Sequence, residues 1–303
     1  MNTSFQHSQV GFPHSMHAAE DAEERHVSGS IGDYIRDACK LSDEQIDQIL
    51  SHQKERGIRF GEAAVSLRLA TPDDVIWALS KQFKYPYVPS DLKGSGELIA
   101  ASQPFSDESE AFREMRSQLL MGALSPQLPR RALAVMSPGA GEGRSFVAAN
   151  LAVAFSQLGG RTVIVDADMR TPRLREIFGL SDAHAGLSTI LSGRAERRMI
   201  QQVRGLSSLF VVPSGPVPPN PQELLQRPTF GLLITELLHK FDHVLVDTPS
   251  ASHGSDARVI AARCGVALVL GRKGRTRMDQ LQGVVSSLEK SSVTVAGVVM
   301  NEY

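Results

Sequence analysis

A short glycine-rich segment constrains the fold of this chain more than any other feature of the sequence. It reads Gly139-Ala140-Gly141-Glu142-Gly143-Arg144-Ser145 and lies between an apolar run, Ala132 to Met136, and an Ala- and Val-rich segment that continues to Leu158. The apolar run predicts a buried strand, and the segment after the glycines predicts a helix. A strand, a glycine loop and a helix in this order predict a phosphate-binding P-loop, because glycines let backbone N–H groups curl around a phosphate at a helix N-terminus.

One position of this motif departs from the usual P-loop pattern. The pattern ends in Gly-Lys-Ser or Gly-Lys-Thr, whereas Arg144 stands at the lysine position here. Arginine keeps the positive charge but is bulkier and planar. Ser145 is placed to offer its hydroxyl to a magnesium ion. An ordinary glycine turn is the alternative interpretation, and the strand and helix on either side argue against it.

The length and composition of the chain limit its class. A chain of 303 residues suggests two domains, or one domain with appendages. The net charge of −1 gives no reason to expect a nucleic-acid partner. The two cysteines, Cys39 and Cys264, are far apart and are expected to be reduced, as in the cytosol. No apolar run reaches the roughly 18 residues of a membrane span, so a cytoplasmic protein that reaches a membrane only through a partner is expected.

Two segments are expected to lack packed structure. Residues 1–29 are polar and contain His7, His14, His17 and His26, but the irregular spacing favours a disordered tail over a metal site. Residues 90–106, with Gly94 and Gly96, are expected to form a linker.

Residues 30–89, between these two segments, contain an internal repeat and are expected to form a small helical domain. Ile31-Gly32-Asp33 matches Phe60-Gly61-Glu62 at an offset of 29 residues, and Ser42 and Thr71 match as expected helix N-caps. Each unit is therefore predicted to be a short helix, a turn and a second helix. We expect the second helices of the two units to pack together, with Ile46, Ile49 and Leu50 against Val75, Ala78 and Leu79.

Two further apolar runs end in acidic residues. Thr162 to Asp168 reads TVIVDAD and places Asp166 and Asp168 at its end, and His243 to Asp247 reads HVLVD. In an open α/β sheet the ligand lies outside the carboxyl ends of the strands, so these carboxylates are expected beside the P-loop phosphates and Mg²⁺. A helix N-cap and a surface acid are the alternative interpretation of Asp166 and Asp168.

Strands are also expected at residues 209–213, 266–270 and 293–300, with helices between them. This alternation predicts an α/β fold: a P-loop NTPase domain over residues 107–303, with a mostly parallel sheet covered by helices on both faces and preceded by the small all-helical domain. The helix expected at 110–121 carries Glu110, Arg113 and Arg116 three residues apart, which places them on one face.

Several of these motifs together resemble the bacterial tyrosine kinases, or BY-kinases. The segment 139–145 resembles their Walker A motif, VIVDAD resembles Walker A′ and VLVDTPS resembles Walker B. Similar family features are the Glu110, Arg113, Arg116 helix, the proline-rich stretch Gly215–Leu225, Gly274–Arg277 and the final Gly297–Asn301. Together with the added helical domain, they resemble the EpsG-type chain-length determinant kinases of exopolysaccharide gene clusters.

The resemblance implies an ATP- and Mg²⁺-dependent protein tyrosine kinase that tunes exopolysaccharide polymerisation, chain length and export. An inner-membrane polysaccharide co-polymerase is the implied activator, and the helix of Glu110, Arg113 and Arg116 implies ring-like self-association. Ser145, Asp166 and Asp247 are the implied Mg²⁺ ligands. Asp166 and Asp168 would activate the tyrosine hydroxyl, and Arg144 with the Walker A amides would hold phosphates.

Two assignments at the end of the chain complete this set. Asn301 lies where the family approaches the base, and Tyr303 is the candidate phosphoacceptor, in a chain with four tyrosines. The family usually carries several tyrosines in a C-terminal tail, which this sequence does not show.

The helical repeat resembles the N-terminal domain of type II secretion and pilus-assembly ATPases. In that family the repeat can bind cyclic di-GMP through an arginine that corresponds to Arg59, whereas the first unit has Ser30 in its place. A docking module that binds no ligand is the alternative.

Two alternatives for the whole chain stay open. One is a nucleotide-binding but catalytically weak regulator or scaffold on the membrane partner, which Arg144 and the few tyrosines favour. The other is a P-loop ATPase of the partitioning or cell-division type. Such ATPases usually carry an extra lysine early in the loop, and residues 137–140 contain none.

Overall fold

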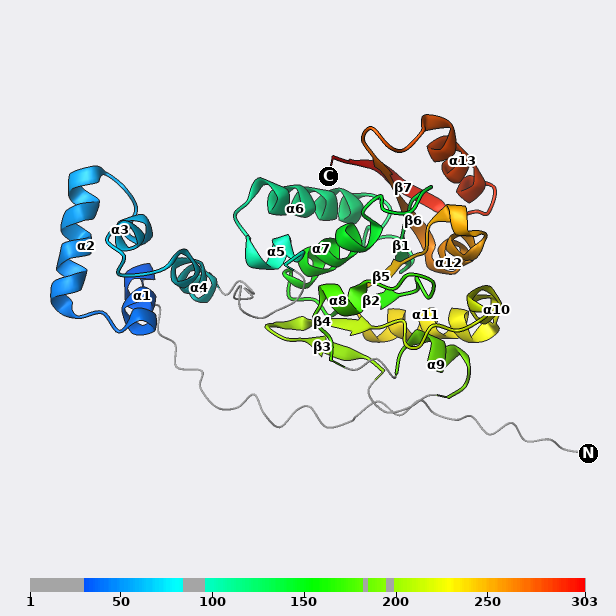
Figure 1. The fold of residues 1–303 in the computed structure, drawn as a ribbon, viewed down its shortest axis with the longest axis horizontal. Helices are drawn as coiled ribbons and strands as arrows, with labels where there is room; N and C mark the ends of the chain where they lie inside the picture. The colour runs from blue at the N-terminus through cyan, green and yellow to red at the C-terminus, as the bar shows by residue number, and fades with distance from the viewer. Residues whose placement is uncertain (1–29, 84–95, 182–184, 195–198, 303) are drawn as a thin grey trace, which may run out of the picture.

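The computed structural model describes residues 30–83, 96–181, 185–194 and 199–302. Helices form the N-terminal part of the described chain, and a larger α/β unit follows them (Figure 1). The expected tail at 1–29, the first part of the expected linker and Tyr303 lie outside the described residues.

The four N-terminal helices follow the repeat in the sequence. They are α1 (Ile31–Cys39), α2 (Asp43–Arg56), α3 (Phe60–Ser66) and α4 (Pro72–Gln82). The starts of α1 and α3, and those of α2 and α4, are separated by the repeat offset. The predicted caps are confirmed, because Ser42 accepts a hydrogen bond from the Gln45 N–H and Thr71 accepts one from the Asp74 N–H.

The pairing of these helices differs from the expected one. α1 packs against α4 and α2 packs against α3, so the prediction that α2 faces α4 is wrong. Ile49 of α2 is buried with Ala63 and Ala64 of α3, whereas Leu50 is 40% exposed. Gly57 ends α2 in the left-handed conformation and turns the chain back within a few residues, which places α3 beside α2.

The α/β unit is built on one sheet. Its strands in the described residues are β1 (Ala132–Met136), β2 (Thr162–Asp166), β3 (Gln201–Val203), β4 (Leu206–Val212), β5 (His243–Asp247), β6 (Gly265–Arg272) and β7 (Thr294–Asn301). They lie in the order β3-β4-β2-β5-β1-β6-β7, and every neighbouring pair is parallel except β3 with β4. This confirms the mostly parallel α/β fold.

Helices cover both faces of this sheet. One face carries α5 (Ile99–Ser102), α6 (Asp107–Met121), α7 (Arg144–Ser156) and α8 (Leu174–Ile177). The other carries α9 (Leu187–Leu191), α10 (Pro221–Gln226), α11 (Pro228–Lys240), α12 (Asp256–Cys264) and α13 (Met278–Glu289). A short 3₁₀ helix, η1 (Ala251–His253), follows β5.

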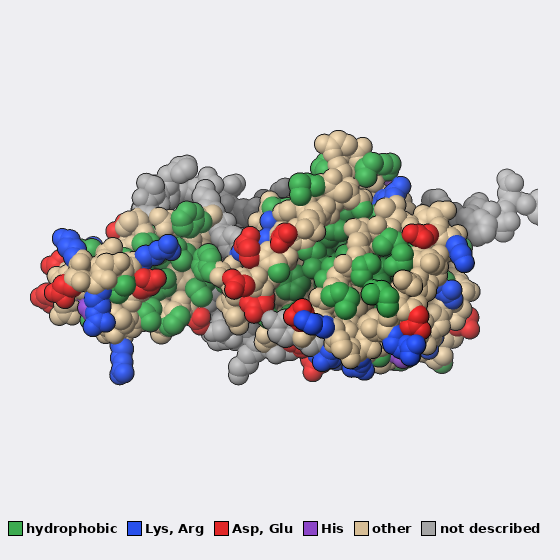
Figure 2. Space-filling view, turned by 90° about the horizontal axis from the view of Figure 1, so that it is seen from above, with side chains coloured by type: hydrophobic (Ala, Val, Ile, Leu, Met, Phe, Trp, Pro, Cys, Tyr) green, Lys and Arg blue, Asp and Glu red, His purple; other side chains and the backbone are tan. Residues whose placement is uncertain are grey.

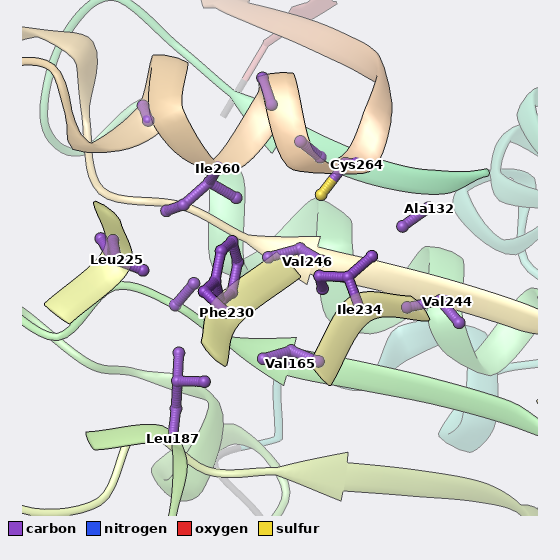
Figure 3. Packing of buried hydrophobic residues seen from close by; sticks show 14 of the residues in the cluster. Ala132, Val165, Leu187, Leu225, Phe230, Ile234, Val244, Val246, Ile260 and Cys264 are labelled. Carbon is purple, nitrogen blue, oxygen red and sulfur yellow. The ribbon is translucent and has the colours of Figure 1, made fainter. Parts of the chain in front are cut away.

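Successive residues of the central strands enter two separate cores. In β1, Leu133 and Val135 pack under α6 and α7, whereas Ala132, Ala134 and Met136 pack on the opposite side. Figure 3 shows this second core, with Phe230 of α11 among Val246, Leu225 and Ile260. Burial on both faces explains why the strands are continuous apolar runs instead of alternating ones.

Part of the expected linker is packed against the sheet domain. Ala100 and Ala101 of α5 are buried, and the Ala100 N–H donates to Asn150 Oδ1 of α7 at 2.9 Å. Asn150 Nδ2 donates to the carbonyl of Glu97 at 2.8 Å. Residues from Glu97 onward are therefore continuous with the α/β unit, and no apolar periodicity in so short a helix signalled this in the sequence.

One face of the molecule carries hydrophobic side chains beside charges of both signs (Figure 2). Figure 2 shows both basic and acidic side chains spread over the visible face, in keeping with the net charge of −1. None of the helices within the described ranges is both long and apolar enough to cross a membrane.

The two repeat glycines offer a matched test of the helix packing. A Cβ at Gly61 would lie 2.6 Å from Cγ1 of Val75, whereas a Cβ at Gly32 would come no closer than 3.5 Å to Phe60. We expect Gly61→Ala to lower the free energy of unfolding by about 1–2 kcal/mol through overpacking, and Gly32→Ala to raise it by about 0.5–1 kcal/mol. Urea unfolding monitored by the fluorescence of Trp77, the one tryptophan of the chain, measures both. Equal effects of the two substitutions would contradict the packing of α3 on α4.

Candidate active site

The glycine loop joins β1 to α7 in the arrangement that the motif predicts. Gly141 and Gly143 have φ values of 73° and 94°, in the left-handed region that favours glycine. A Cβ at Gly143 would lie 2.2 Å from Nδ2 of Asn301, which leaves no room for a side chain. Asn301 Nδ2 donates to the carbonyl of Glu142 at 3.2 Å. The structure thus brings Asn301 against the loop, where its side-chain hydrogen bond supports the backbone of the loop.

The three predicted acidic residues converge at the carboxyl edge of the sheet, beside this loop. Asp166 ends β2 and Asp247 ends β5, and the two are paired in register across the parallel strands. β5 is in turn paired with β1, the strand that leads into the loop. Asp166 and Asp247 are fully buried, and Asp168 is 2% exposed. This excludes the interpretation of Asp168 as a surface acid.

The three carboxylates differ in how far their oxygens are hydrogen-bonded. Asp168 accepts bonds from the N–H groups of Arg170 and Thr171 and from the Thr171 hydroxyl, at 2.9–3.1 Å. Asp166 accepts a bond from the Leu174 N–H at 3.2 Å, through Oδ2. Oδ1 of Asp166 and both oxygens of Asp247 are buried without a hydrogen-bond partner of normal geometry. Burying a polar oxygen without a hydrogen bond costs free energy of folding. These oxygens are therefore candidates to bind a cation or a hydrogen-bond donor.

Burial shifts the protonation of two of these groups. Desolvation raises the pKa of Asp247 to about 7, although the nearby Ser145 hydroxyl and the Arg144 guanidinium oppose the rise. Desolvation and the charge of Asp247 raise the pKa of Asp166 well above its usual range. At neutral pH, and with no cation bound, the cluster therefore retains protons that a divalent cation would displace.

Arg144 turns into the protein beside these acids. Its Nε donates to the carbonyl of Thr248 at 2.8 Å, and its Nη1 donates to the carbonyl of Gly139 at 2.7 Å and to the Ser137 hydroxyl. Its Nη2 lies 3.9 Å from Oδ2 of Asp168, and the residue is only 7% exposed. Arg144 thus closes the base of the loop and supplies positive charge to the acidic cluster.

The residues present fit a magnesium site that is completed by phosphate oxygens. Within the described ranges, no three carboxylate, imidazole or thiolate groups form a metal site by themselves. Mg²⁺ commonly uses one or two carboxylates together with waters and substrate phosphates, so a full protein cage is not needed. The unpartnered oxygens of Asp166 and Asp247, with the Ser145 hydroxyl near Asp247, are suitable hard oxygen donors.

A second loop, which the sequence did not single out as part of the site, lies against the P-loop. Thr276 donates its hydroxyl hydrogen bond to the carboxylate of Glu142, and that carboxylate also accepts the Gly139 N–H at 2.7 Å. Arg272 Nη1 donates to the carbonyl of Gly141 at 3.1 Å. Glu142 therefore points into the protein at 2% exposure, so the nucleotide contact predicted for it would fall to its backbone. The Gly274–Arg277 motif is the sequence signal from which a position of this loop beside the P-loop could have been predicted.

Comparison with known proteins agrees with this geometry. Residues 133–303, more than half of the chain, match the family model of the CobQ/CobB/MinD/ParA nucleotide binding domain. The tyrosine-protein kinase YwqD of Bacillus subtilis is 30% identical over 204 residues, which cover 67% of this chain and 85% of YwqD. The chain belongs to the bacterial tyrosine-protein kinases. This confirms the BY-kinase resemblance, and the partitioning-type alternative is set aside.

Other similar proteins extend the comparison. Tyrosine-protein kinase Wzc of Salmonella typhimurium is 32% identical over 205 residues, but the match spans only 28% of Wzc. The crystal structure of the chimerical protein CapA2B2 superposes with a TM-score of 0.64 at 33% identity, covering 74% of this chain and 97% of that one. The kinase domain of the Escherichia coli tyrosine kinase ETK gives a TM-score of 0.64 at 28% identity, covering 71% of this chain and 80% of that domain.

Three predicted site residues of this family member lie on α6. Arg113 forms an ion pair with Glu110 at 2.5 Å and donates to the carbonyl of Pro104. Arg116 reaches the carbonyl of Ala154 at the end of α7, at 2.7 Å. Both arginines bind within their own chain, and Glu110, with its side chain 70% exposed, is the member of the set that is most open to a partner.

Arg59 lies far from the kinase motifs, at the start of α3. Its backbone N–H donates to the Glu62 carboxylate at 2.9 Å, and the residue is exposed. Ser30 takes the equivalent place before α1 and caps that helix through its hydroxyl. Helix capping thus explains a serine at this position, whether or not the repeat binds cyclic di-GMP. Tyr303 lies outside the described residues.

The raised pKa of Asp247 predicts a pH dependence of stability. In the unfolded chain an aspartate loses its proton near pH 4, whereas folded Asp247 keeps its proton up to about pH 7. The free energy of unfolding therefore falls as pH rises between these values and levels off above them. We expect Asp247→Asn to exceed the wild type by roughly 1–4 kcal/mol at pH 8 without Mg²⁺, and to lose this advantage at pH 4.

Urea unfolding from pH 4 to 8 in a metal-free buffer measures this difference. Asp37→Asn, a change at an exposed side chain of α1, is the matched control and should follow the wild-type profile. An Asp247→Asn protein that is no more stable than the wild type at pH 8 would show that this carboxyl group is not destabilising when charged.

Proposed function

We propose that this chain is an ATP-dependent protein tyrosine kinase that phosphorylates tyrosines on copies of itself. The observation that carries the proposal is the convergence of three buried acids with the P-loop of a chain in this family. Asp166, Asp168 and Asp247 lie at the carboxyl edge of the sheet, where Ser145 and Arg144 begin α7. The role in exopolysaccharide polymerisation, chain length and export is part of this proposal and rests on the family resemblance.

The residues of the site have separate tasks in this proposal. The backbone N–H groups of residues 139–145 bind the phosphates of ATP, and Asn301 contacts the base or supports the loop beneath it. Ser145, Asp166 and Asp247 hold Mg²⁺. When bound, Mg²⁺ neutralises charge on the phosphates during transfer. Arg144 keeps the loop closed and compensates the acidic cluster.

The hydrogen bonds favour Asp166 over Asp168 as the group that accepts the tyrosine proton. Three bonds from its own loop occupy the carboxylate of Asp168, and Arg144 faces it. Oδ1 of Asp166 has no hydrogen-bond partner, so in the ionised form of this group that oxygen is open to the tyrosine hydroxyl. Asp168 in this interpretation fixes the loop after β2 and orients Arg144.

The remaining parts of the proposal concern partners. Self-association into a ring would use the exposed Glu110, and an unchanged mass of Glu110→Ala in light scattering would count against it. An inner-membrane polysaccharide co-polymerase would activate the kinase at the cytoplasmic face. Tyr303 would be the acceptor in trans.

The resemblance of the helical repeat to secretion ATPases stays a prediction. If the repeat has a ligand, cyclic di-GMP would bind to it through Arg59. The absence of heat on titration of cyclic di-GMP into the full chain would discard that ligand.

The inward position of Arg144 favours a second candidate, a nucleotide-binding regulator with weak catalysis. A guanidinium that is bonded to Thr248, Gly139 and Ser137 has little freedom to follow a phosphoryl group in the transition state. Phosphorylation assays of the wild type, Asp166→Asn and Arg144→Lys separate the two candidates.

Intact mass spectrometry after incubation with Mg-ATP tests the kinase. We expect added phosphate on the wild type, mapped to tyrosine, and none on Asp166→Asn. Asparagine resembles the protonated carboxyl group that folding favours at this site, so this variant should keep the melting temperature of the wild type. Phosphate found only on Arg144→Lys would support the regulator. Equal phosphorylation of the wild type and Asp166→Asn would exclude Asp166 as the proton acceptor.

A further inference from the structure

The segment that joins β6 to α13 is basic and is held on the P-loop. We call residues 272–277 the β6–α13 loop; its sequence is Arg-Lys-Gly-Arg-Thr-Arg. Arg272 donates to the carbonyl of Gly141, and Thr276 donates to the carboxylate of Glu142. Two side-chain bonds therefore fix a basic segment to the middle of the loop that the proposed function assigns to phosphate binding.

Arg275 is the residue of this segment that lies over the glycine loop. A Cβ built on Gly141 would meet Nη1 of Arg275 at 3.0 Å, and Cζ and Nη2 at 3.5 Å. The guanidinium of Arg275 thus lies directly beside the Cα of Gly141. The residue is exposed, and among the described residues its guanidinium has no ion-pair or hydrogen-bond partner. Its donors are available to a ligand at the rim of the P-loop.

Arg144, the residue at the usual lysine position, does not have this freedom. Its bonds to Thr248, Gly139 and Ser137 hold its guanidinium inside the protein, close to Asp168. Moving it toward a phosphate would break these bonds and leave buried carbonyl groups and the Asp168 carboxylate without their cation, which is costly.

We propose that Arg275 supplies the cationic contact to the polyphosphate of a bound nucleoside triphosphate, while Arg144 keeps the P-loop closed. The inference rests on the proposed nucleotide-dependent function. A guanidinium offers paired donors that match phosphate oxygens, so an exposed arginine at the lip of the loop can bind the β- or γ-phosphate from outside. Arg272 and Thr276 position the loop that carries Arg275.

Arg277 provides a matched control within the same loop. It is also an exposed arginine, but its guanidinium forms an ion pair with Asp279 at 3.1 Å, and the pair is exposed on both sides. Its removal changes the net charge of the chain as much as removal of Arg275 does. A difference between the two variants therefore reports position and not overall charge.

Isothermal titration of full-length protein with ATP and ADP in the presence of Mg²⁺ tests the proposal. We expect Arg275→Gln to weaken both affinities at least tenfold and to make them less sensitive to salt. Arg277→Gln should stay within twofold of the wild type, and Arg275→Lys should recover part of the loss. Without nucleotide, Arg144→Gln should lower the melting temperature, whereas Arg275→Gln should leave it unchanged.

The possible failures are distinct. If the wild type binds ATP and Arg275→Gln binds it equally well, the contact by Arg275 is excluded while the kinase proposal stands. An equal loss in Arg277→Gln also overturns the contact, because the effect would then be one of net charge. If the wild type binds neither ATP nor ADP, both this inference and the proposed function are wrong.

Discussion

Three buried carboxylates beside a glycine loop are the constraint on which the rest of this site depends. Asp166, Asp168 and Asp247 are placed there by the parallel register of β2 and β5, and burying their charges is unfavourable unless they are protonated or compensated. Two effects reduce this cost: desolvation raises the pKa values of Asp166 and Asp247, which favours their protonated forms, and the guanidinium of Arg144 turns toward the cluster. The arginine at the lysine position therefore also offsets part of the negative charge of the buried carboxylates.

This arrangement assigns two tasks to two different parts of the chain: Arg144 closes the P-loop, and the β6–α13 loop supplies the cation for phosphate. A lysine presents one compact charge, whereas the planar fork of Arg144 reaches three acceptors at once and can tie the two ends of the loop together. The β6–α13 loop then becomes the available source of positive charge on the outer side, because it is fixed to Gly141 and Glu142. An active kinase would need this arrangement to align the transferred phosphoryl group. In a weak regulator, the arrangement would bind the nucleotide without that alignment.

Much of this could be predicted from the sequence, because the decisive signals are local. An apolar run that ends in Asp166 or Asp247 gives both the strand and the position of its carboxylate, and the repeat gives the starts of the four helices. The pairing of those helices, the docking of Ala100 on α7 and the inward turn of Arg144 could not be predicted. They depend on contacts between segments far apart in the chain, to which neither periodicity nor spacing is sensitive.

The central claim is that Arg144 and the acidic cluster form one electrostatic unit, and a double-mutant cycle tests it most directly. The free energy of unfolding would be measured at pH 8, without Mg²⁺ or nucleotide, for the wild type, Arg144→Met, Asp168→Asn and the double variant. The account predicts a coupling of about 1–3 kcal/mol, with the double variant more stable than the sum of the single losses implies. A coupling of zero would show that Arg144 closes the loop without compensating the acids, and would contradict the claim.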